Sequence, residues 1–338
     1  MDQPVSVYDL VQSHRITALI YAAAKLNLAE AIGADAKSAA ELARLVDADE
    51  SALRRLLVGL TTLGLCRHVD RDRFAMTDLG RRLDEIADPS LKDWVLFEGE
   101  MLLQSWSGLV ESVRTGKTAA QLRGDGDDRY AAMSNTPQST RLFNAAMVSL
   151  TRTLVPKIVT AYDFAAARIV MDLGGGTGEL IGGVLRHNPH LQGIAFDLAR
   201  CEAEARAHFD RLGIAGRCRF VAGSFFEAVP GGADTILMKS ILHNWKDDRC
   251  ETILKNCWNA LPSGGALVVI ERIMPESVTT DPQDRSCVMS DLNMLRGPGG
   301  CERTEAEYCR LAVLNGFALV GTTGIGSFSL IQFRKVGS

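Results

Sequence analysis

A short glycine-rich segment offers the clearest chemistry in this sequence. Asp172-Leu-Gly-Gly-Gly-Thr-Gly178 follows an apolar run and opens a helical pattern. In that setting glycines let the backbone approach a ligand closely, and the helix amino terminus offers free N–H donors. The Gly-x-Gly-x-x-Gly spacing of nicotinamide sites fails here, because its last position falls on Glu179 or Ile181. We therefore favour a different ligand from a nicotinamide dinucleotide.

Two aspartates indicate which kind of ligand the glycine segment binds. Asp172 stands two residues before the glycines, where a carboxylate repels a pyrophosphate but attracts a cationic amino-acid end. Asp197 ends the next apolar run, about 25 residues later, near the spacing of an acid that binds ribose hydroxyls. Together they predict a nucleoside ligand with a cationic amino-acid end.

The elements that must position these residues alternate between strand and helix. Helical segments separate most of the short apolar runs, which lie at 169–173, 194–197, 219–222, 235–238 and 267–270. This alternation is typical of a mostly parallel sheet covered by helices on both faces. Residues 317–320 and 329–333 predict a closing hairpin around Gly324 and Gly326.

The chain before this domain has a helical pattern. Apolar residues at helical spacing predict helix over residues 5–32, with Gly33 as a stop. Ser38-Ala-Ala-Glu41 is a capping box, and leucines at 53–63 predict a second short helix that ends at Gly64. The alternating run 66–76 predicts a hairpin, so the order is that of a winged helix. Residues 90–160 look mostly helical, with a Gly/Asp-rich loop at 123–128.

Composition and charge narrow the function classes. The chain has 338 residues and a net charge of −4, so no overall positive field attracts nucleic acid or anionic membrane. The eight cysteines form no Cys-x-x-Cys pair or zinc spacing, and we expect no metal and a reducing compartment. We see no signal peptide at the start and no apolar stretch long enough to span a membrane, and we expect a cytoplasmic protein.

Four sequence blocks, in this order, resemble a known family. They are Asp-Leu-Gly-Gly-Gly-Thr-Gly (172–178), Leu-Met-Lys-Ser-Ile-Leu-His-Asn-Trp-Lys-Asp-Asp (237–248), Ile-Glu-Arg-Ile-Met-Pro-Glu (270–276) and Gly-Gly-Cys-Glu-Arg-Thr (299–304). They resemble the signature blocks of S-adenosylmethionine-dependent small-molecule O-methyltransferases, which include plant caffeate-type enzymes and bacterial enzymes of antibiotic or phenazine biosynthesis. The resemblance covers nearly the whole chain.

The resemblance implies an α/β fold and a division into domains. A winged-helix dimerisation domain would occupy 1–95, and a helical linker that contributes to the substrate pocket would occupy 96–160. A Rossmann-like class I methyltransferase domain, with its mostly parallel sheet and C-terminal antiparallel hairpin, would occupy 161–338. The protein would be a homodimer through its N-terminal domain. We read the apolar residues Leu19, Ile20, Leu26, Leu28 and the 53–63 leucines as too many for so small a unit to bury.

The resemblance also assigns roles to matched positions. His243 would be the catalytic base, with Glu271 and Glu302 beside it. S-adenosylmethionine would be bound by eight residues: Asp172, Gly174, Gly176, Asp197, Ser224, Phe225, Lys239 and Trp245. Of these, Phe225 and Trp245 would lie beside the adenine, and Lys239 would lie near the methionine end. The sequence departs from the family at Ser224, where Asp is usual on the adenine side, and at Asn244, where Asp is frequent.

The chemistry of His243 agrees with that assignment. Methyl transfer from a sulfonium removes a proton from the acceptor hydroxyl, and a histidine with pKa near 6.5 suits that step. His243 follows a strand and should therefore lie at the carboxyl edge of the sheet, where ligands bind. We expect Phe143, Met147, Asn293 and Met294 to line the pocket for a small aromatic acceptor.

Other functions remain open from the sequence. The chain could methylate nitrogen, or bind the cofactor without transferring methyl. A DNA-binding regulator is less favoured, because Asp49 and Glu50 would sit at the start of the recognition helix, where phosphates need positive charge.

Overall fold

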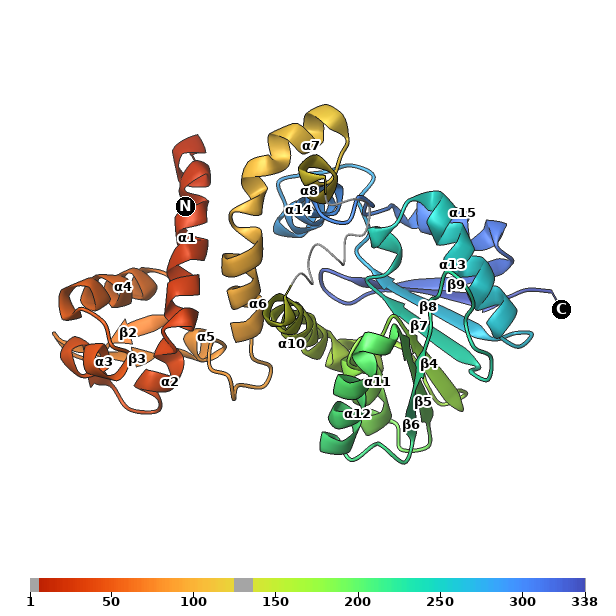
Figure 1. Cartoon of the computed structure of the whole chain (residues 1–338), viewed down its shortest axis with the longest axis horizontal. Helices are drawn as coiled ribbons and strands as arrows, with labels where there is room; N and C mark the ends of the chain where they lie inside the picture. Colours follow the sequence, from red (N-terminus) through yellow and green to blue (C-terminus); the bar gives the residue numbers. More distant parts are fainter. Residues whose placement is uncertain (1–5, 125–135, 338) are drawn as a thin grey trace. The chain divides into compact units, whose positions relative to one another are not determined.

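The computed structural model describes residues 6–124 and 136–337, and the chain divides into two units (Figure 1). The first unit comprises Met1–Ser107 and Met133–Leu150, and the second comprises Gly108–Ala132 and Thr151–Ser338. Helix α10 (Pro137–Ala161) begins in the first unit and ends in the second. The predicted linker, 96–160, is thus shared between the two units.

The first unit has the predicted order of helices followed by a hairpin. Its elements are α1 (Val7–Lys25), α2 (Leu28–Ile32), β1 (Lys37–Ser38), α3 (Ala39–Leu45), α4 (Glu50–Thr62), β2 (Cys66–His68), β3 (Arg73–Met76), α5 (Asp78–Arg81), α6 (Lys92–Phe97), the π-helix η1 (Glu98–Leu102) and the 3₁₀-helix η2 (Ser105–Gly108), whose last residue belongs to the second unit. The strand order is β1-β3-β2. The Ser38 capping box is present, with Glu41 as its partner.

The region 5–32 is two helices rather than one. Asn27 lies in the left-handed region, with φ of 53°, and separates α1 from α2. Asparagine tolerates this conformation better than most residues. The resulting turn lets Leu28 and Ile32 enter the core of the unit.

The apolar residues behind our dimer argument are packed inside the first unit. Leu28 and the leucines Leu53, Leu57 and Leu60 are buried, and Leu19, Ile20 and Leu26 pack against the same core. Our statement that the unit could not hold them was therefore wrong. The apolar residues left exposed are different ones. Five of them lie on α1, Val7, Tyr8, Leu10, Val11 and Ile16, and others are scattered at Leu45, Val58, Val69, Leu79 and Ile86.

The second unit is built on a seven-stranded sheet of order β6-β5-β4-β7-β8-β10-β9. Its strands are β4 (Ile169–Leu173), β5 (Gln192–Asp197), β6 (Cys218–Ala222), β7 (Thr235–Lys239), β8 (Ala266–Glu271), β9 (Phe317–Gly324) and β10 (Ser329–Lys335). β4 to β8 pair in parallel, whereas β10 is antiparallel to both β8 and β9. The predicted parallel sheet and closing hairpin are thus both present.

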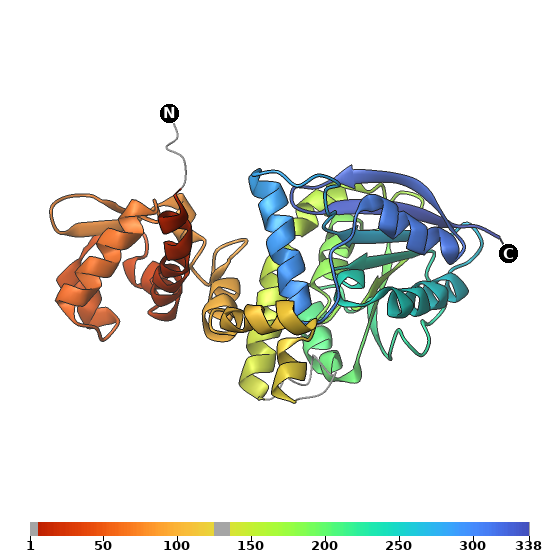
Figure 2. The same cartoon turned by 90° about the horizontal axis from the view of Figure 1, so that it is seen from above.

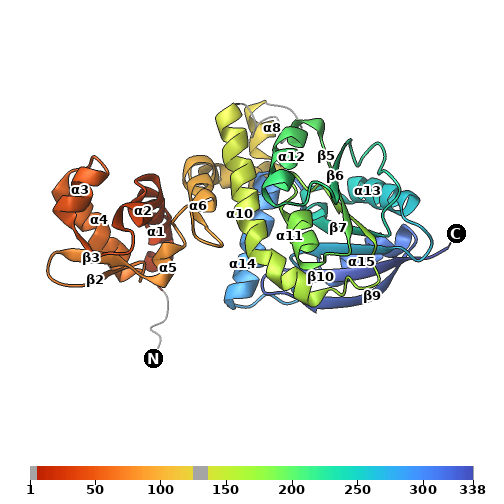
Figure 3. The same cartoon turned by 90° about the horizontal axis from the view of Figure 1, so that it is seen from below.

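Helices cover both faces of this sheet (Figures 1 and 3). One face is covered by α11 (Glu179–His187), the 3₁₀-helix η3 (Ala199–Cys201) and α12 (Glu202–Arg211). The other is covered by the 3₁₀-helix η4 (Leu242–Asn244), α13 (Asp247–Ala260) and α15 (Glu305–Leu314). Helix α14 (Pro282–Arg296) lies between β8 and α15 in the chain. Alternate residues of each strand point to opposite faces: in β8, Val268 packs with the α11–α12 core and Val269 with the α13–α15 core.

Two further helices of the second unit are α7 (Leu109–Thr115) and α8 (Ala119–Arg123). α7 packs against α14, which Figure 2 shows from above. The predicted Gly/Asp-rich loop at 123–128 lies mostly outside the described residues. Among the helices that the structure describes, none is both long enough and apolar enough to cross a membrane.

The sheet order places the site. β4 lies between β5 and β7. After β4 the chain adds β5 and β6 on one side of it, and β7 and β8 then lie on its other side. Ligands bind at the carboxyl ends of strands at such a reversal point, because the two following loops diverge there. The glycine segment follows β4, and the turn that carries His243 follows β7.

Candidate active site

The glycine segment forms a tight turn whose backbone conformation favours glycine. Gly174 has φ of 70° and Gly176 has φ of 56°, both in the left-handed region. A Cβ on Gly174 would overlap the side chain of Ile241 in the turn after β7, whereas a Cβ on Gly176 would meet open space. The segment is therefore packed against the protein at Gly174 and accessible to a ligand at Gly176.

Asp172 lies directly beneath this turn and is 2% exposed. Its Oδ2 accepts a hydrogen bond of 3.3 Å from the amide of Ile181 in α11. Burial raises the pKa of Asp172 to about 7, although the Ile181 amide and the Lys239 ammonium oppose the shift. A nearby cation would favour the ionised form, so the site suits a ligand with an ammonium or sulfonium group.

Asp197, at the end of β5, faces the same turn. Its Oδ2 accepts a hydrogen bond of 2.8 Å from the amide of Gly176, and its Oδ1 accepts one of 2.6 Å from the amide of Leu198. The aspartate thus fixes the glycine turn while standing where a ribose is expected. The two predicted acids lie on either side of one loop.

The residues predicted for the adenine side form an aromatic cluster. The rings of Phe225 and Trp245 lie 6.3 Å apart, and that of Phe226 lies 4.6 Å from Trp245. The guanidinium of Arg249 stacks 3.6 Å from the centre of the Phe226 ring. Ser224 begins this segment, and its hydroxyl accepts a hydrogen bond of 3.3 Å from the amide of Phe226.

Lys239 ends β7 between the two acidic parts of the site. Its Nζ lies 3.4 Å from Oγ of Ser240. Burial lowers the pKa of this amine, although the carboxylates of Glu271 and Asp172 oppose the shift. The lysine therefore lies in the electrostatic field of both groups of acids.

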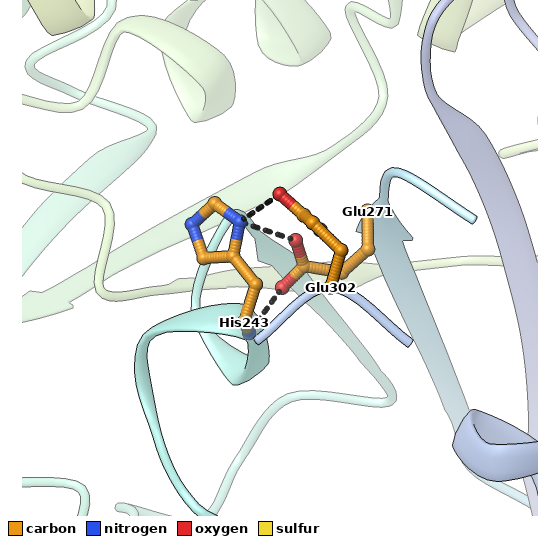
Figure 4. Close-up of side chains that lie close together, drawn as sticks. All are labelled: His243, Glu271 and Glu302. Carbon is orange, nitrogen blue, oxygen red and sulfur yellow. Dashed lines mark hydrogen bonds and ion pairs between the residues drawn. The ribbon is translucent and has the colours of Figure 1, made fainter. Parts of the chain in front are cut away.

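His243 lies in the 3₁₀ turn after β7 and faces two buried carboxylates (Figure 4). Its Nδ1 is 3.0 Å from Oε1 of Glu302 and 3.5 Å from Oε2 of Glu271. Both glutamate side chains are 0% exposed and the histidine side chain is 12% exposed. Figure 4 shows the other ring nitrogen, Nε2, pointing away from both carboxylates.

Each glutamate is fixed by further contacts. Oε1 of Glu271 accepts hydrogen bonds from the amides of Ile241, Leu242 and His243, at 2.9, 2.8 and 3.3 Å. Oε1 of Glu302 also accepts one of 2.6 Å from the hydroxyl of Ser290 in α14. The carboxylates therefore hold one ring nitrogen and leave the other available.

The electrostatics of the group favour a charged imidazole. Burial lowers the pKa of His243, but the carboxylates of Glu271 and Glu302 outweigh burial, so the net pKa is above 6.5. Burial likewise raises the pKa of Glu271, against the opposing effect of His243. A histidine in this setting is a stronger base than a free one.

The same three side chains have the donor types of a metal site. One ligand atom from each of His243, Glu271 and Glu302 lies within 4.8 Å of the other two. The single hydrogen on Nδ1 can be donated to Oε1 of Glu302. Oε2 of Glu271 and Oε2 of Glu302 are buried and have no hydrogen-bond partner among the described residues. The absence of a metal cofactor stays a prediction.

The residues predicted to bind substrate lie on two helices. Phe143 and Met147 belong to α10 in the first unit, where the ring of Phe143 lies 5.7 Å from that of Phe97. Asn293 and Met294 belong to α14 in the second unit, where Asn293 accepts a hydrogen bond of 2.6 Å from Arg296. That the four line one pocket stays a prediction.

Sequence reasoning missed several residues around His243. Ser290 bonds to Glu302, Asp291 accepts a hydrogen bond of 2.9 Å from the Glu302 amide, and Arg303 contacts the turn that carries His243. The only signal for Arg303 was its place within the block 299–304, directly after Glu302.

Comparison with known protein families agrees with this architecture. Residues 106–318 match the model of an O-methyltransferase domain, and residues 8–84 match that of an O-methyltransferase dimerisation domain. The chain is 33% identical over 335 residues to O-demethylpuromycin-O-methyltransferase of Streptomyces alboniger, covering 98% of this chain and 89% of the relative.

Two further matches bear on chemistry. Aclacinomycin 10-hydroxylase RdmB of Streptomyces purpurascens is 32% identical over 325 residues, covering 93% of this chain and 86% of the relative. A solved structure of an O-methyltransferase from neocarzinostatin biosynthesis, NcsB1, in complex with S-adenosylmethionine and 2-hydroxy-5-methyl naphthoic acid, has a TM-score of 0.79 and 28% identity, covering 99% of this chain and 100% of that one. The chain belongs to the S-adenosylmethionine-dependent small-molecule O-methyltransferases.

Proposed function

We propose that this enzyme methylates a hydroxyl group of a small aromatic secondary metabolite, with His243 as the general base. The observation that carries the proposal is the arrangement around the imidazole. Nδ1 faces two buried carboxylates at 3.0 and 3.5 Å, and Nε2 points away from them. A histidine whose Nδ1–H is held by a carboxylate presents the lone pair of Nε2 as a base.

The proton follows a simple path. As the acceptor oxygen forms its bond to the methyl group, its proton passes to Nε2 of His243. The imidazolium that results is stabilised by Glu302 and Glu271, which are already in contact with Nδ1. The proton then leaves to solvent after the products separate. General-base assistance of this kind is worth about 10²–10⁴-fold in rate.

The cofactor site fits S-adenosylmethionine on the chemistry of its residues. Gly174 and Gly176 provide the close backbone approach, Asp197 is placed for the ribose, and Asp172 is a buried acid suited to the cationic amino-acid end. Phe225, Trp245 and Ser224 would lie beside the adenine, and Lys239 would lie near the methionine end. When bound, the cofactor supplies an electrophilic methyl group on a sulfonium.

The comparisons support an aromatic acceptor. The similar neocarzinostatin enzyme binds a hydroxy naphthoic acid, and the puromycin relative is named for O-methylation. We assign Phe143, Met147, Asn293 and Met294 to the acceptor pocket. A nitrogen acceptor is compatible with the same base, because the amine also loses a proton.

We further propose a homodimer through the first unit. The match to a dimerisation domain over residues 8–84 supports it, as does the row of exposed apolar side chains on α1. Exposed apolar patches of this kind mark interfaces, and two-fold dimers are the most frequent solution.

A second candidate is a family member that binds the cofactor without transferring methyl. The relative named as a hydroxylase favours it, because it is 32% identical over most of both chains. The two functions differ in products: methyl transfer releases S-adenosylhomocysteine and a methylated acceptor in equal amounts, whereas hydroxylation yields neither.

The experiment is a methyl-transfer assay with methyl-labelled S-adenosylmethionine and a panel of phenols, hydroxybenzoates, hydroxynaphthoates and anilines. We expect label in at least one hydroxylated aromatic, with matching S-adenosylhomocysteine. Labelling of anilines alone would make the enzyme an N-methyltransferase. Cofactor binding without label in any member, together with an oxygenated product, would favour the second candidate.

A further inference from the structure

The turn that carries His243 is held in a demanding conformation. Ser240, which begins it, has φ of 55°, a left-handed value that a non-glycine residue keeps only when its surroundings enforce it. Asn244 closes the turn, donating a hydrogen bond of 2.9 Å from Nδ2 to the carbonyl of Ser240. Glu271 satisfies the amides on one side. The carbonyl of Leu242 accepts a hydrogen bond of 3.0 Å from the amide of Trp245, and the thiol of Cys250 lies 3.3 and 3.5 Å from the carbonyls of Leu242 and Trp245.

Arg303 adds a charged donor to each of these two carbonyls, and hydrogen bonds to charged groups are stronger than neutral ones. Nη1 donates to the carbonyl of Leu242 at 3.1 Å, and Nη2 donates to that of Trp245 at 2.8 Å. These two carbonyls stand immediately before His243 and two residues after it. The guanidinium thus spans the peptide segment from which the imidazole projects.

The remaining N–H groups of Arg303 are also used. Nε and Nη2 donate to Oδ1 of Asp247 at 3.1 and 2.8 Å, and Nη1 lies 3.5 Å from the carbonyl of Cys301. A guanidinium has five N–H donors in a fixed plane, and five contacts are present here. The arginine side chain is 3% exposed. A lysine, with three donors on one point, cannot span these positions.

The neighbouring residues bring Arg303 to the turn. Gly300 has no side chain, and a Cβ there would overlap the carbonyl of His243. Glu302 turns its side chain to the imidazole and Arg303 turns its side chain to the backbone of the same turn. The segment 300–303 therefore contacts both the imidazole of His243 and the backbone of the turn that carries it.

We propose that Arg303 is a positioning residue that fixes the orientation of His243 by bridging the carbonyls of Leu242 and Trp245. The inference rests on the proposed role of His243 as base. Arg303 does not touch the reacting atoms in this account. It also ties the base to Trp245, so the base and the adenine side of the site are held by one guanidinium.

The test is a double-mutant cycle of Arg303→Lys with His243→Ala. We expect Arg303→Lys to lower kcat about tenfold to a hundredfold, the effect of misplacing a catalytic group by about 1 Å. In the His243→Ala background the same change should have almost no effect, because the group that it positions is gone. KM for the acceptor should stay within about twofold.

The chain offers a matched control. Arg310 also binds Asp247, donating a hydrogen bond of 2.7 Å to Oδ2, but its side chain is 54% exposed, whereas the buried Arg303 contacts the turn. Arg310→Ala should keep kcat within about twofold. If Arg303→Lys does not fold, Asp247→Asn keeps the oxygen acceptor for Arg303 while removing its counter-charge. It should lower kcat a few-fold in the parent and not at all in the His243→Ala background.

The outcomes separate this inference from the proposed function. An unchanged kcat in Arg303→Lys would overturn the inference. So would a double variant whose loss of kcat equals the product of the losses in the two single variants. A His243→Ala enzyme with near-parental kcat would refute the base itself. A slow His243→Ala enzyme in which Arg303→Lys causes no further loss would support both.

Discussion

Replacing Glu302 by Gln tests how much the buried carboxylate contributes to the base. Glu302 is the nearer of the two carboxylates, with its Oε1 3.0 Å from Nδ1. Gln keeps an oxygen acceptor for Nδ1–H and for the hydroxyl of Ser290, but it removes the negative charge. The change therefore keeps the hydrogen bonds and removes the contribution of the carboxylate charge to them.

The magnitude follows from that difference. A hydrogen bond to a charged group contributes about 1.5–3 kcal/mol and a neutral one about 0.5–1.5 kcal/mol. The loss is thus about 1–1.5 kcal/mol in stabilising the imidazolium, which corresponds to roughly a tenfold lower kcat.

The pH dependence gives a second readout. The carboxylates hold the pKa of His243 above 6.5, so the rate of the parent should fall as pH drops through a value above 6.5, where the base takes up a proton. Glu302→Gln removes one of the two carboxylates that raise the pKa of His243. The acid limb of the kcat–pH profile should therefore move to lower pH, and the plateau value of kcat should fall.

The assay is kcat against pH with a neutral phenol at saturating cofactor. Glu305→Gln is a matched control, because Glu305 is exposed and accepts a hydrogen bond of 2.9 Å from the hydroxyl of Thr322. A Glu302→Gln enzyme with the parental plateau and acid limb would refute the electrostatic role of this carboxylate.

Three further predictions concern the cofactor and the assembly. Asp197→Ala should weaken S-adenosylmethionine binding by about 1.5–3 kcal/mol, measured by calorimetry; unchanged affinity would remove Asp197 from the site. Because the pKa of Asp172 is about 7 and the cationic cofactor favours its ionised form, affinity should rise as pH increases toward and past 7, with proton release on binding. Asp172→Asn should abolish this dependence, and its persistence would assign the proton elsewhere. Light scattering should report a dimer. Val11→Asp on the exposed face of α1 should weaken this dimer, whereas the control Val313→Asp on α15 should not. A parent protein that is monomeric at micromolar concentration would contradict the dimer.

The sheet could be predicted from the sequence because each strand carries a local signal. Runs such as 267–270 are continuously apolar, since strands of a parallel sheet are buried on both faces. Glycines and helix caps mark where these runs stop. The structure keeps the run 169–173 unchanged as β4 and extends the other parallel strands by one or two residues, as β8 does from Ala266 to Glu271.

The first unit shows where local patterns fail. The helical periodicity of residues 5–32 continues across Asn27, so it gave no sign of the break there. The same pattern could not say which apolar residues the unit buries itself. That depends on how α1, α2 and α4 pack together, and tertiary packing decides it rather than spacing.

The structure brings together the predicted residues His243, Glu271 and Glu302, but the sequence could not give their contacts. The family blocks identified His243, Glu271 and Glu302 as candidates. Glu271 and Glu302 stand 28 and 59 residues from the histidine in the sequence, so their contacts with it depend on the fold. Only the folded chain shows that Glu302 is the nearer carboxylate and that Ser290 supports it. The role of Arg303 could not be predicted, because its partners are mainly backbone carbonyls, which a pattern of side chains in the sequence does not reveal.

The most direct measurement is the turnover of the His243→Ala variant on a neutral phenol, alongside its affinity for S-adenosylmethionine. We predict kcat lower by about 10²–10⁴-fold and nearly unchanged cofactor affinity, because the glycine turn and Asp197 keep their contacts. The loss should be smaller for an acceptor whose hydroxyl is already ionised. Turnover within a few-fold of the parent on the neutral phenol would contradict the account, leaving an enzyme that only positions its reactants.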